Sequence, residues 1–238
     1  MTSSVTPRKR ANQHQVHAAA TTVCLRDGKR GLEVLLVRRT AKLVFYGGAW
    51  VFPGGRVDPG DAERAGIDTD DLYCEAAARQ AAAREAHEEA KVVVDPEALV
   101  PISHWTTPPG RPRRFATWFF VAHTPVDDVE VDAGEIEQHR WFTLAEALSA
   151  HGAGHIELPP PTYVTLDQLR AHELAAQVIQ VARDSGSPVV RYVPKPIIRK
   201  DGVISLYEGD AGYNTGDPSA KGRRHRLSML QDGWRYER

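Results

Sequence analysis

Three carboxylates lie close together in the short stretch Arg84-Glu85-Ala86-His87-Glu88-Glu89. The surrounding residues are rich in Ala, Glu, Arg and Gln, which favour helix, and they predict a helix over residues 71–90. At about 100° per residue, Glu85, Glu88 and Glu89 then share one helix face. Clustered carboxylates repel one another unless cations neutralise them, and oxygen ligands without cysteine favour Mg²⁺ or Mn²⁺ over zinc. The spacing predicts a divalent-metal site, although a solvated acidic face is the alternative for such a helix.

A glycine- and proline-rich stretch, residues 47–60, precedes this helix. It has too many glycines for a strand interior and too few polar residues for a linker, so we expect a shaped loop. Gly54 and Gly55 would let the main chain approach a substrate or the helix closely. Arg84, one residue before the carboxylates, is expected to compensate part of their charge. These residues predict a structural loop set against the acidic helix.

The rest of the chain predicts an α+β fold with a mixed β-sheet between helices. Runs of β-branched and aromatic residues indicate strands at 16–25, 32–37, 92–94, 101–105, 113–122 and 139–142. Helices are expected at 144–148 and 165–183, the second as one long amphipathic helix. We divide the chain into a polar tail that we expect to be disordered (1–15), a main domain (16–183) and a C-terminal extension (184–238), which we expect to pack on the domain. The basic run 221–226 is interpreted as solvated surface.

Composition excludes several partners. The sequence has 30 Lys and Arg against 31 Asp and Glu, a net charge of -1, so it predicts no nucleic-acid and no membrane-surface partner. No stretch is apolar for the roughly 20 residues that a membrane helix needs. Two cysteines, Cys24 and Cys74, suit a reducing compartment, and the first 15 residues carry no apolar signal region. We expect a cytoplasmic protein; the sequence leaves open whether it is a homodimer.

The loop and the helix together closely resemble the signature of the Nudix hydrolase family, which is Gly, five residues, Glu, seven residues, then Arg-Glu-aliphatic-any-Glu-Glu-any-Gly-aliphatic. Here Gly55 is followed after five residues by Asp61, and REAHEE follows after 22 more. The chain thus has Asp where the family has Glu, an insertion of 15 residues in the spacer, and Lys91 at the place of the helix-ending Gly. A left-handed conformation costs a non-Gly residue on the order of 1 kcal/mol, so we expect the helix to end differently.

The resemblance implies an α/β/α sandwich and the hydrolysis of a nucleoside diphosphate linked to another group, by attack of water on phosphorus with Mg²⁺ or Mn²⁺. Residues 105–122 and 134–148 look like the later strands and the following helix of that fold. The first stretch, together with the insertion, is similar to the branch that contains the coenzyme A diphosphatases. The substrate expected first is therefore coenzyme A or an acyl ester of it. ADP-ribose or another dinucleotide, and a non-catalytic nucleotide-binding regulator, are the alternatives.

Roles follow for residues inside and outside the signature. Glu85, Glu88 and Glu89 are expected as metal ligands, with Glu88 and Glu89 also counted as catalytic. Glu135 stands where many family members bring a carboxylate to the metal centre from a loop, and Glu137 is its nearest competitor as general base; a solvated acidic loop is the alternative. Guanidinium groups bind phosphates through paired hydrogen bonds, although a basic loop without a ligand would look the same. The arginines expected at substrate are Arg38, Arg39, Arg56, Arg111, Arg113 and Arg114.

Overall fold

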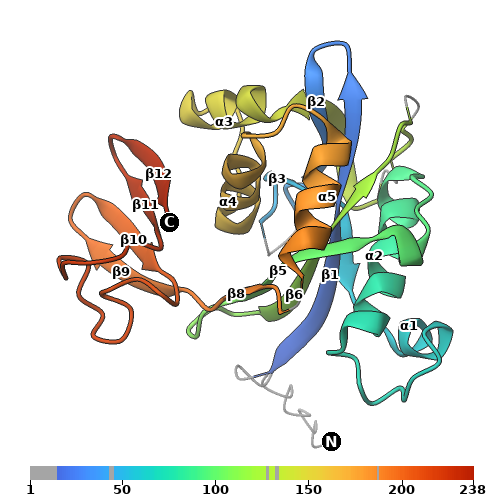
Figure 1. Ribbon diagram of the computed structural model, residues 1–238, viewed down its shortest axis with the longest axis horizontal. Helices are drawn as coiled ribbons and strands as arrows, with labels where there is room; N and C mark the ends of the chain where they lie inside the picture. The colour runs from blue at the N-terminus through green and yellow to red at the C-terminus, as the bar shows by residue number, and fades with distance from the viewer. Residues whose placement is uncertain (1–14, 43–45, 127–128, 132–133, 187) are drawn as a thin grey trace, which may run out of the picture.

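A mixed β-sheet, sheet A, forms the centre of the protein in the computed structural model, which describes residues 15–42, 46–126, 129–131, 134–186 and 188–238 (Figure 1). Six of its strands lie in the order β3-β2-β1-β6-β5-β8, while β4 pairs with β1 and β7 pairs with β2. The pairs β1–β6 and β5–β8 are parallel and the others are antiparallel. The strands are β1 (Val16–Gly28), β2 (Gly31–Arg39), β3 (Trp50–Val51), β4 (Gly54–Arg56), β5 (Val100–Thr106), β6 (Arg114–His123), β7 (Ile136–Thr143) and β8 (Val190–Tyr192).

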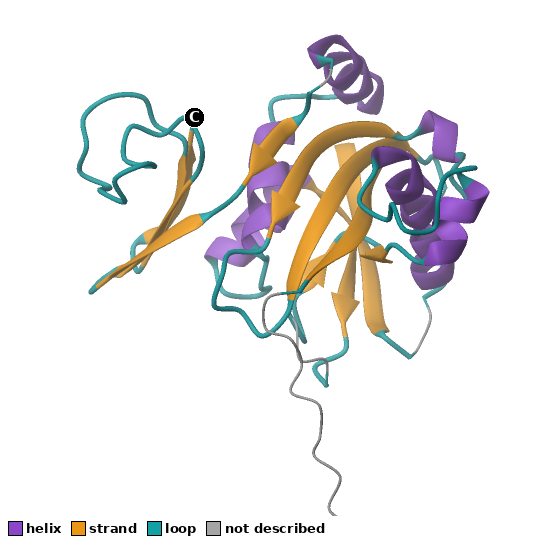
Figure 2. Ribbon diagram, turned by 90° about the horizontal axis from the view of Figure 1, so that it is seen from below, coloured by secondary structure: helices purple, strands orange, loops and turns teal. Residues whose placement is uncertain are grey.

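Helices cover both faces of sheet A (Figures 1 and 2). They are α1 (Pro59–Arg64), α2 (Glu75–Ala90), the 3₁₀ turn η1 (Pro96–Ala98), α3 (Leu144–Gly152), α4 (Pro160–Leu169) and α5 (Ala175–Ser185). The first two lie on one face, and α3, α4 and α5 lie on the other. The predicted α+β class with a mixed sheet between helices is confirmed. None of the helices in the described ranges is long and apolar enough to span a bilayer.

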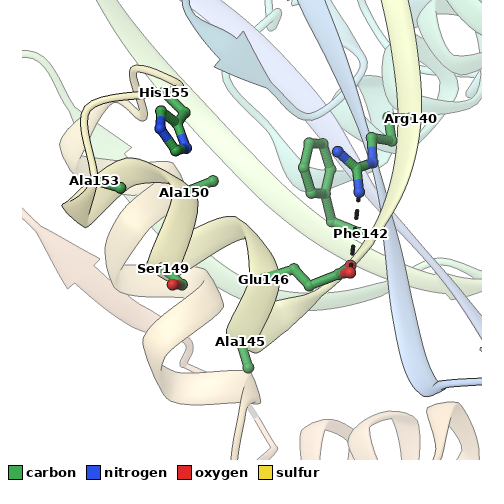
Figure 3. Close-up of a pocket in the computed structure, with 8 residues that line it drawn as sticks. All are labelled: Arg140, Phe142, Ala145, Glu146, Ser149, Ala150, Ala153 and His155. Atoms are coloured by element: carbon green, nitrogen blue, oxygen red, sulfur yellow. Dashed lines mark ion pairs between the residues drawn. The ribbon is translucent and has the colours of Figure 1, made fainter.

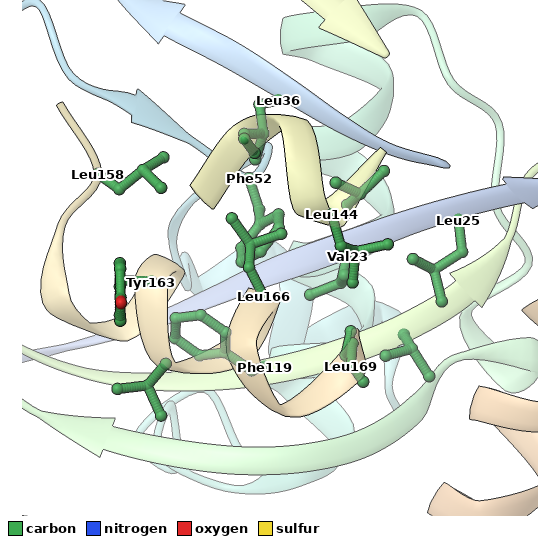
Figure 4. Packing of buried hydrophobic residues seen from close by; sticks show 14 of the residues in the cluster. Val23, Leu25, Leu36, Phe52, Phe119, Leu144, Leu158, Tyr163, Leu166 and Leu169 are labelled. Carbon is green, nitrogen blue, oxygen red and sulfur yellow. The ribbon is translucent and has the colours of Figure 1, made fainter. Parts of the chain in front are cut away.

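The side chains of β1 alternate between the two faces of sheet A and contribute to the hydrophobic core on both. Ala18 and Ala20 pack under α2, whereas Val23 and Leu25 point to the opposite side, because successive side chains of a strand alternate. On that opposite side, leucines from β2, α3 and α4 and Phe119 from β6 close around β1 (Figure 4). Burying each such side chain stabilises the fold by roughly 1.5–3 kcal/mol. The sheet is therefore a rigid base for the loops at its edges.

Three of the predicted elements differ from the structure. The helix predicted over 71–90 begins at Glu75, because the Cys74 thiol caps it by accepting from the Ala77 amide. The single helix predicted over 165–183 is two helices, α4 and α5. The break is stabilised by side chains, since the Ala175 amide donates to Asp27 and the Gln177 side chain accepts from the amides of Glu173 and Leu174. Residues 92–94 form no strand.

The end of α2 corrects another expectation. Lys91 adopts the left-handed conformation, φ 54° and ψ 19°, that the family's glycine would adopt. Its amide donates to the carbonyl of His87, and the Val92 amide donates to the carbonyl of Ala86. Val92 is buried beside Ala90, and burial of a valine outweighs a strain of about 1 kcal/mol. The helix thus ends as it would with glycine, at a cost in strain.

The C-terminal extension forms a second, antiparallel sheet, sheet B, which stands beyond the helices that cover sheet A (Figure 2). Its strands are β9 (Lys195–Arg199), β10 (Gly202–Leu206), β11 (Arg226–Leu230) and β12 (Gly233–Glu237). The Trp105 and Tyr192 rings stack at 3.9 Å, and the Tyr163 hydroxyl donates to the Trp234 carbonyl. Arg226, in the run interpreted as solvated, is instead buried. Its guanidinium holds the buried Asp210 through two hydrogen bonds, at 2.7 and 2.6 Å.

Candidate active site

The glycine loop lies directly on the acidic face of α2. The Gly54 amide donates to Oε2 of Glu89 at 2.9 Å. A Cβ at Gly55 would lie only 2.4 to 2.6 Å from the Glu85 carboxylate, so any side chain there would displace it. Strand β4 carries both glycines and is fixed by pairing with β1. The structure therefore brings the predicted loop residues and two of the predicted ligands together.

Arg84 connects this loop to the carboxylates. Its Nε and Nη2 donate to the two oxygens of Asp61 at 3.1 and 3.0 Å. Nη2 also donates to the Arg56 carbonyl, and Nη1 donates to both Glu85 and Glu88, each at 2.9 Å. One guanidinium thus joins the loop, the start of the long spacer and the acidic helix face. The 15-residue insertion leaves this connection intact.

Asp61 is the buried anchor of the connection. Burial alone would raise the pKa of Asp61, but hydrogen bonds from Arg84 and from the Asp58 amide lower it below its ordinary value. The side chain is fully buried and also pairs with Arg64. Asp61 lies in the first turn of α1, and both of its carboxylate oxygens accept directly from the Arg84 guanidinium.

The three carboxylates of the acidic face differ in burial. Glu89 is 7% exposed, and burial raises its pKa to about 7 although the Gly54 amide and Arg39 act in the opposite direction. Glu85 is half-buried, and burial likewise raises its pKa in spite of Arg84. The Glu88 side chain is exposed. The inner part of the face therefore holds carboxylates whose negative charge is costly.

These carboxylates have the donor chemistry that a divalent cation requires. All their ligand atoms are hard oxygens, and Glu85 and Glu135 both raise the pKa of Glu89 by repulsion, which a bound cation would relieve. Over the ranges that the structure describes, no three His, Cys, Asp or Glu side chains are already gathered for metal binding. Arg84 holds Glu85 and Glu88 in their present positions.

Glu135 and Arg39 lie at the rim of the carboxylate cluster. Nη2 of Arg39 is 3.7 Å from Oε2 of Glu135, and both residues act electrostatically on Glu89. The Glu135 carbonyl accepts from the Thr40 amide, which fixes the loop to the end of β2. Nε of Arg39 is buried, and no described atom accepts its hydrogen bond. Glu137, the competitor of Glu135, accepts instead from the Ala41 amide at 3.3 Å.

The other predicted arginines are spread over the surface. Nε of Arg38 donates to the Gly48 carbonyl at 3.4 Å, and Nε of Arg114 donates to the Thr107 carbonyl at 3.0 Å. Both are therefore already engaged by the main chain.

The remaining three arginines have exposed side chains. Arg56 and Arg113 act on the same group, His17, whose pKa is lowered by burial and then by these two charges. Arg111 lies near Tyr46 and opposes the rise in its pKa that burial causes. Arg39, by contrast, lies beside Glu135, and its charge lowers the pKa of Glu89 against the effect of burial.

Two threonines of β1 touch both halves of the site, although no motif marks them. The Thr21 hydroxyl donates to the Pro53 carbonyl in the loop, and the Thr22 hydroxyl donates to the Ala82 carbonyl in α2. Their one signal in the sequence is a polar pair in the middle of an apolar strand.

Two open hollows lie away from this cluster. One, of about 450 Å³, lies between α3 and β7 (Figure 3). Arg140 stacks on Phe142 there and faces Glu146, with 4.0 Å between the charged groups. The other, of about 770 Å³, lies at the β1–β2 hairpin around Arg26 and His123. None of the predicted site residues lines either hollow.

A mixed sheet between helical layers, with a glycine loop lying on an acidic helix face, defines the class of fold and site that the Nudix signature implied. Residues 16–160 match the family model described as NUDIX domain, and the chain belongs to this family. A NUDIX hydrolase from Alicyclobacillus acidocaldarius is 25% identical, with a TM-score of 0.63 over 70% of this chain and 96% of that one. The protein is therefore a hydrolase of the Nudix family.

Two further solved structures are more distant. A MutT NUDIX hydrolase from Burkholderia pseudomallei is 20% identical, with a TM-score of 0.48 over 66% of this chain and 99% of that one. The NUDIX domain of Shewanella oneidensis NrtR, solved with ADP ribose, is 16% identical, with a TM-score of 0.48 over 68% and 93%. The family is shown by the family model, which matches residues 16–160, and the coenzyme A branch stays a prediction.

Proposed function

We propose that the protein hydrolyses the diphosphate linkage of a nucleoside diphosphate derivative by attack of water on phosphorus, with Mg²⁺ or Mn²⁺ held by Glu85, Glu88 and Glu89. One observation carries the proposal. Glu89 is buried and Glu85 half-buried beneath the Gly54–Gly55 loop, and burial together with repulsion by Glu85 and Glu135 raises the pKa of Glu89. A site that holds negative charge at such a cost suits a cation and the polyanionic substrate that the cation would bring.

The divalent cation would lower the pKa of the attacking water and neutralise charge on the phosphoryl oxygens. The chain's own residues have the supporting tasks. The Gly54 amide orients Glu89, and Arg84 orients Glu85 and Glu88. Glu135, exposed at the rim, would accept the proton of the water. The partly exposed guanidinium of Arg39, beside Glu135 at the rim, would bind a phosphate oxygen.

The substrate proposed first is coenzyme A or one of its acyl esters, because residues 105–122 and the spacer insertion resemble that branch of the family. ADP-ribose and dinucleotides are the alternatives with the same linkage. A regulator that binds a nucleotide without hydrolysing it is supported less, because such domains commonly lose glutamates of the signature and this chain has all three in REAHEE.

A panel of these diphosphates, assayed with Mg²⁺ and with Mn²⁺ and followed by chromatography of the released nucleotide, tests the proposal. We expect turnover of one class, and its loss in the double variant Glu88→Gln, Glu89→Gln. The matched control is Glu97→Gln with Glu173→Gln, two exposed glutamates outside the site. Unchanged hydrolysis in the first variant would refute the mechanism. No turnover, together with a nucleotide that raises the Tm, would favour the regulator.

A further inference from the structure

Two neighbouring residues of strand β1 make hydrogen bonds to the two halves of the candidate metal site, one to the glycine loop and one to α2. We propose that Thr21 and Thr22 are positioning residues: together they set the distance between the glycine loop and the acidic face of α2, and so the affinity of the site for a divalent cation. This rests on the proposed function only in taking Glu85, Glu88 and Glu89 as the metal ligands.

Thr21 fixes the loop. Its hydroxyl donates to the Pro53 carbonyl at 2.6 Å, and the Thr22 amide donates to the same oxygen at 2.9 Å. The next residue, Gly54, lies so close that a Cβ there would be 2.6 Å from the Thr21 hydroxyl and 2.5 Å from the Ala20 carbonyl. The loop therefore lies too close to β1 for a side chain at Gly54 to fit without a shift.

Thr22 fixes the helix. Its side chain points to the opposite side of β1 and donates to the Ala82 carbonyl at 3.0 Å. A short hydroxyl reaches a helix carbonyl only because α2 faces the sheet with small, fully buried residues: Ala78, Ala81, Ala82 and Ala86. Alanine packing is not directional and would tolerate small shifts of the helix along the strand. A hydrogen bond is directional, so it sets the position of α2 about one turn before Glu85.

The positions of the loop and of the helix together determine one contact, the hydrogen bond between Gly54 and Glu89. The Gly54 amide and Oε2 of Glu89 are 2.9 Å apart, and this separation depends on where Thr21 holds the loop and where Thr22 holds the helix. Both threonines are buried, Thr22 completely and Thr21 to within 7%. Both hydroxyls donate to main-chain carbonyls, so we assign the two threonines a positioning role and not the role of metal ligands. Partners that orient ligands in this way typically change metal affinity 10- to 100-fold when removed.

The experiment compares threonine-to-valine variants, which keep the shape and remove the hydroxyl. Thr22→Val tests the helix contact, and Thr22→Ser restores a hydroxyl with less volume. Thr124→Val is the control, because Thr124 is also a buried threonine and its hydroxyl donates to the Leu25 carbonyl, with no described bond to the loop or to α2. Binding of Mn²⁺ to the full chain is measured from the electron paramagnetic resonance of the free ion, alongside the Tm without metal.

We expect Thr22→Val to weaken Mn²⁺ binding on the order of 10-fold, Thr22→Ser to recover most of it, and Thr124→Val to leave it unchanged despite a comparable fall in Tm. Thr21→Val should weaken binding likewise, and the two valines together should give less than the product of their separate effects, because both act on one contact. Equal Mn²⁺ affinity in the wild type and Thr22→Val would overturn the inference. Tight Mn²⁺ binding by a wild type that hydrolyses nothing would refute the proposed activity alone; a wild type that binds no Mn²⁺ would refute both.

Discussion

The protein uses the same pair of residues in two regions to different ends. In the active-site region Arg84 holds the buried Asp61, and in sheet B Arg226 holds the buried Asp210, each through two hydrogen bonds. The Asp210 carboxylate also accepts from the amides of Gly212 and His225, so that pair is neutral and complete. Arg84 also donates to the carboxylates of Glu85 and Glu88, so one positive charge faces three negative charges and does not neutralise them all.

The pKa values follow this difference. In sheet B, burial would raise the pKa of Asp210, but Arg226 and the two amides outweigh it and lower the pKa to about 2. In the active-site region, burial raises the pKa of Glu89 to about 7 and also raises that of Glu85. In sheet B the hydrogen bonds of Asp210 stabilise the fold. In the active-site region the charges of Glu85 and Glu89 are destabilised, which suits the binding of a cation.

The largest expected effect comes from removing either arginine. Arg226→Met leaves Asp210 buried and unpaired, and should lower the free energy of unfolding by about 3–5 kcal/mol. Arg84→Met should cost less, because Arg64 still pairs with Asp61. Denaturant unfolding measures both. The affinity for Mn²⁺ should fall in Arg84→Met and stay unchanged in folded Arg226→Met. An equal fall in both variants would contradict the conclusion that only the region around Arg84 contributes to metal binding.

The second largest effect should come from low pH, which should reduce the free energy of unfolding by protonating Asp210 in sheet B. The folded pKa of Asp210 is about 2 against an ordinary value of 3.8, so the pair contributes about 2 kcal/mol above pH 4, and this is lost as the pH falls from 4 to 2. Urea unfolding of wild type and Asp210→Asn at pH 5 and pH 3 measures it. The difference between the two proteins should shrink by about 1 kcal/mol over that interval. A difference independent of pH would show that the carboxylate's charge contributes no stability.

A methyl group at the loop should have a moderate effect. Gly55→Ala places a Cβ against the Glu85 carboxylate, and overpacking of this kind should cost about 1–2 kcal/mol and weaken Mn²⁺ binding. Gly60→Ala is the control, since its Cβ would have 3.5 Å to the nearest atom and would lie in helix α1. We expect that variant to be as stable as the wild type or more stable. Thermal unfolding and Mn²⁺ titration compare the two variants. If both have the same Tm and the same Mn²⁺ affinity, the close contact of Gly55 with Glu85 does not matter for stability or for metal binding.

The smallest effect concerns the end of α2. Lys91→Gly removes left-handed strain and should raise the free energy of unfolding by about 1 kcal/mol. Lys91→Ala removes the same charge but keeps the strain, so it should show no such gain. Thermal unfolding compares them. A gain in the alanine variant would mean that charge, and not backbone strain, is what Lys91 costs.

Features that depend on neighbouring residues could be predicted from the sequence. The spacing of Glu85, Glu88 and Glu89 places them on one face of any helix, and the consecutive glycines of the loop predict a close approach of the main chain. The strands 101–105, 113–122 and 139–142 were predicted because their composition favours β-structure independently of what they pair with. The family, the α+β class and hydrolase activity followed from these local patterns.

Other features required the tertiary structure, because they depend on residues far apart in the chain. Thr22 and Ala82 are 60 residues apart, and only the packing of α2 on β1 makes them partners. Asp27 stabilises the break before α5 from 148 residues away, so amphipathic spacing alone predicted one helix where there are two. Burial of Val92 compensates the strain at Lys91.

The active site shows the same division. The sequence alone determined which carboxylates share a helix face, because helix geometry is local. Six arginines matched the chemistry of a phosphate site, and the fold decided that Arg39 lies beside Glu135 and acts on Glu89. In sheet B, the fold converted Arg226 from an expected surface charge into the buried partner of Asp210. Charge and spacing are properties of the chain, whereas burial and partnership exist only once distant segments have packed.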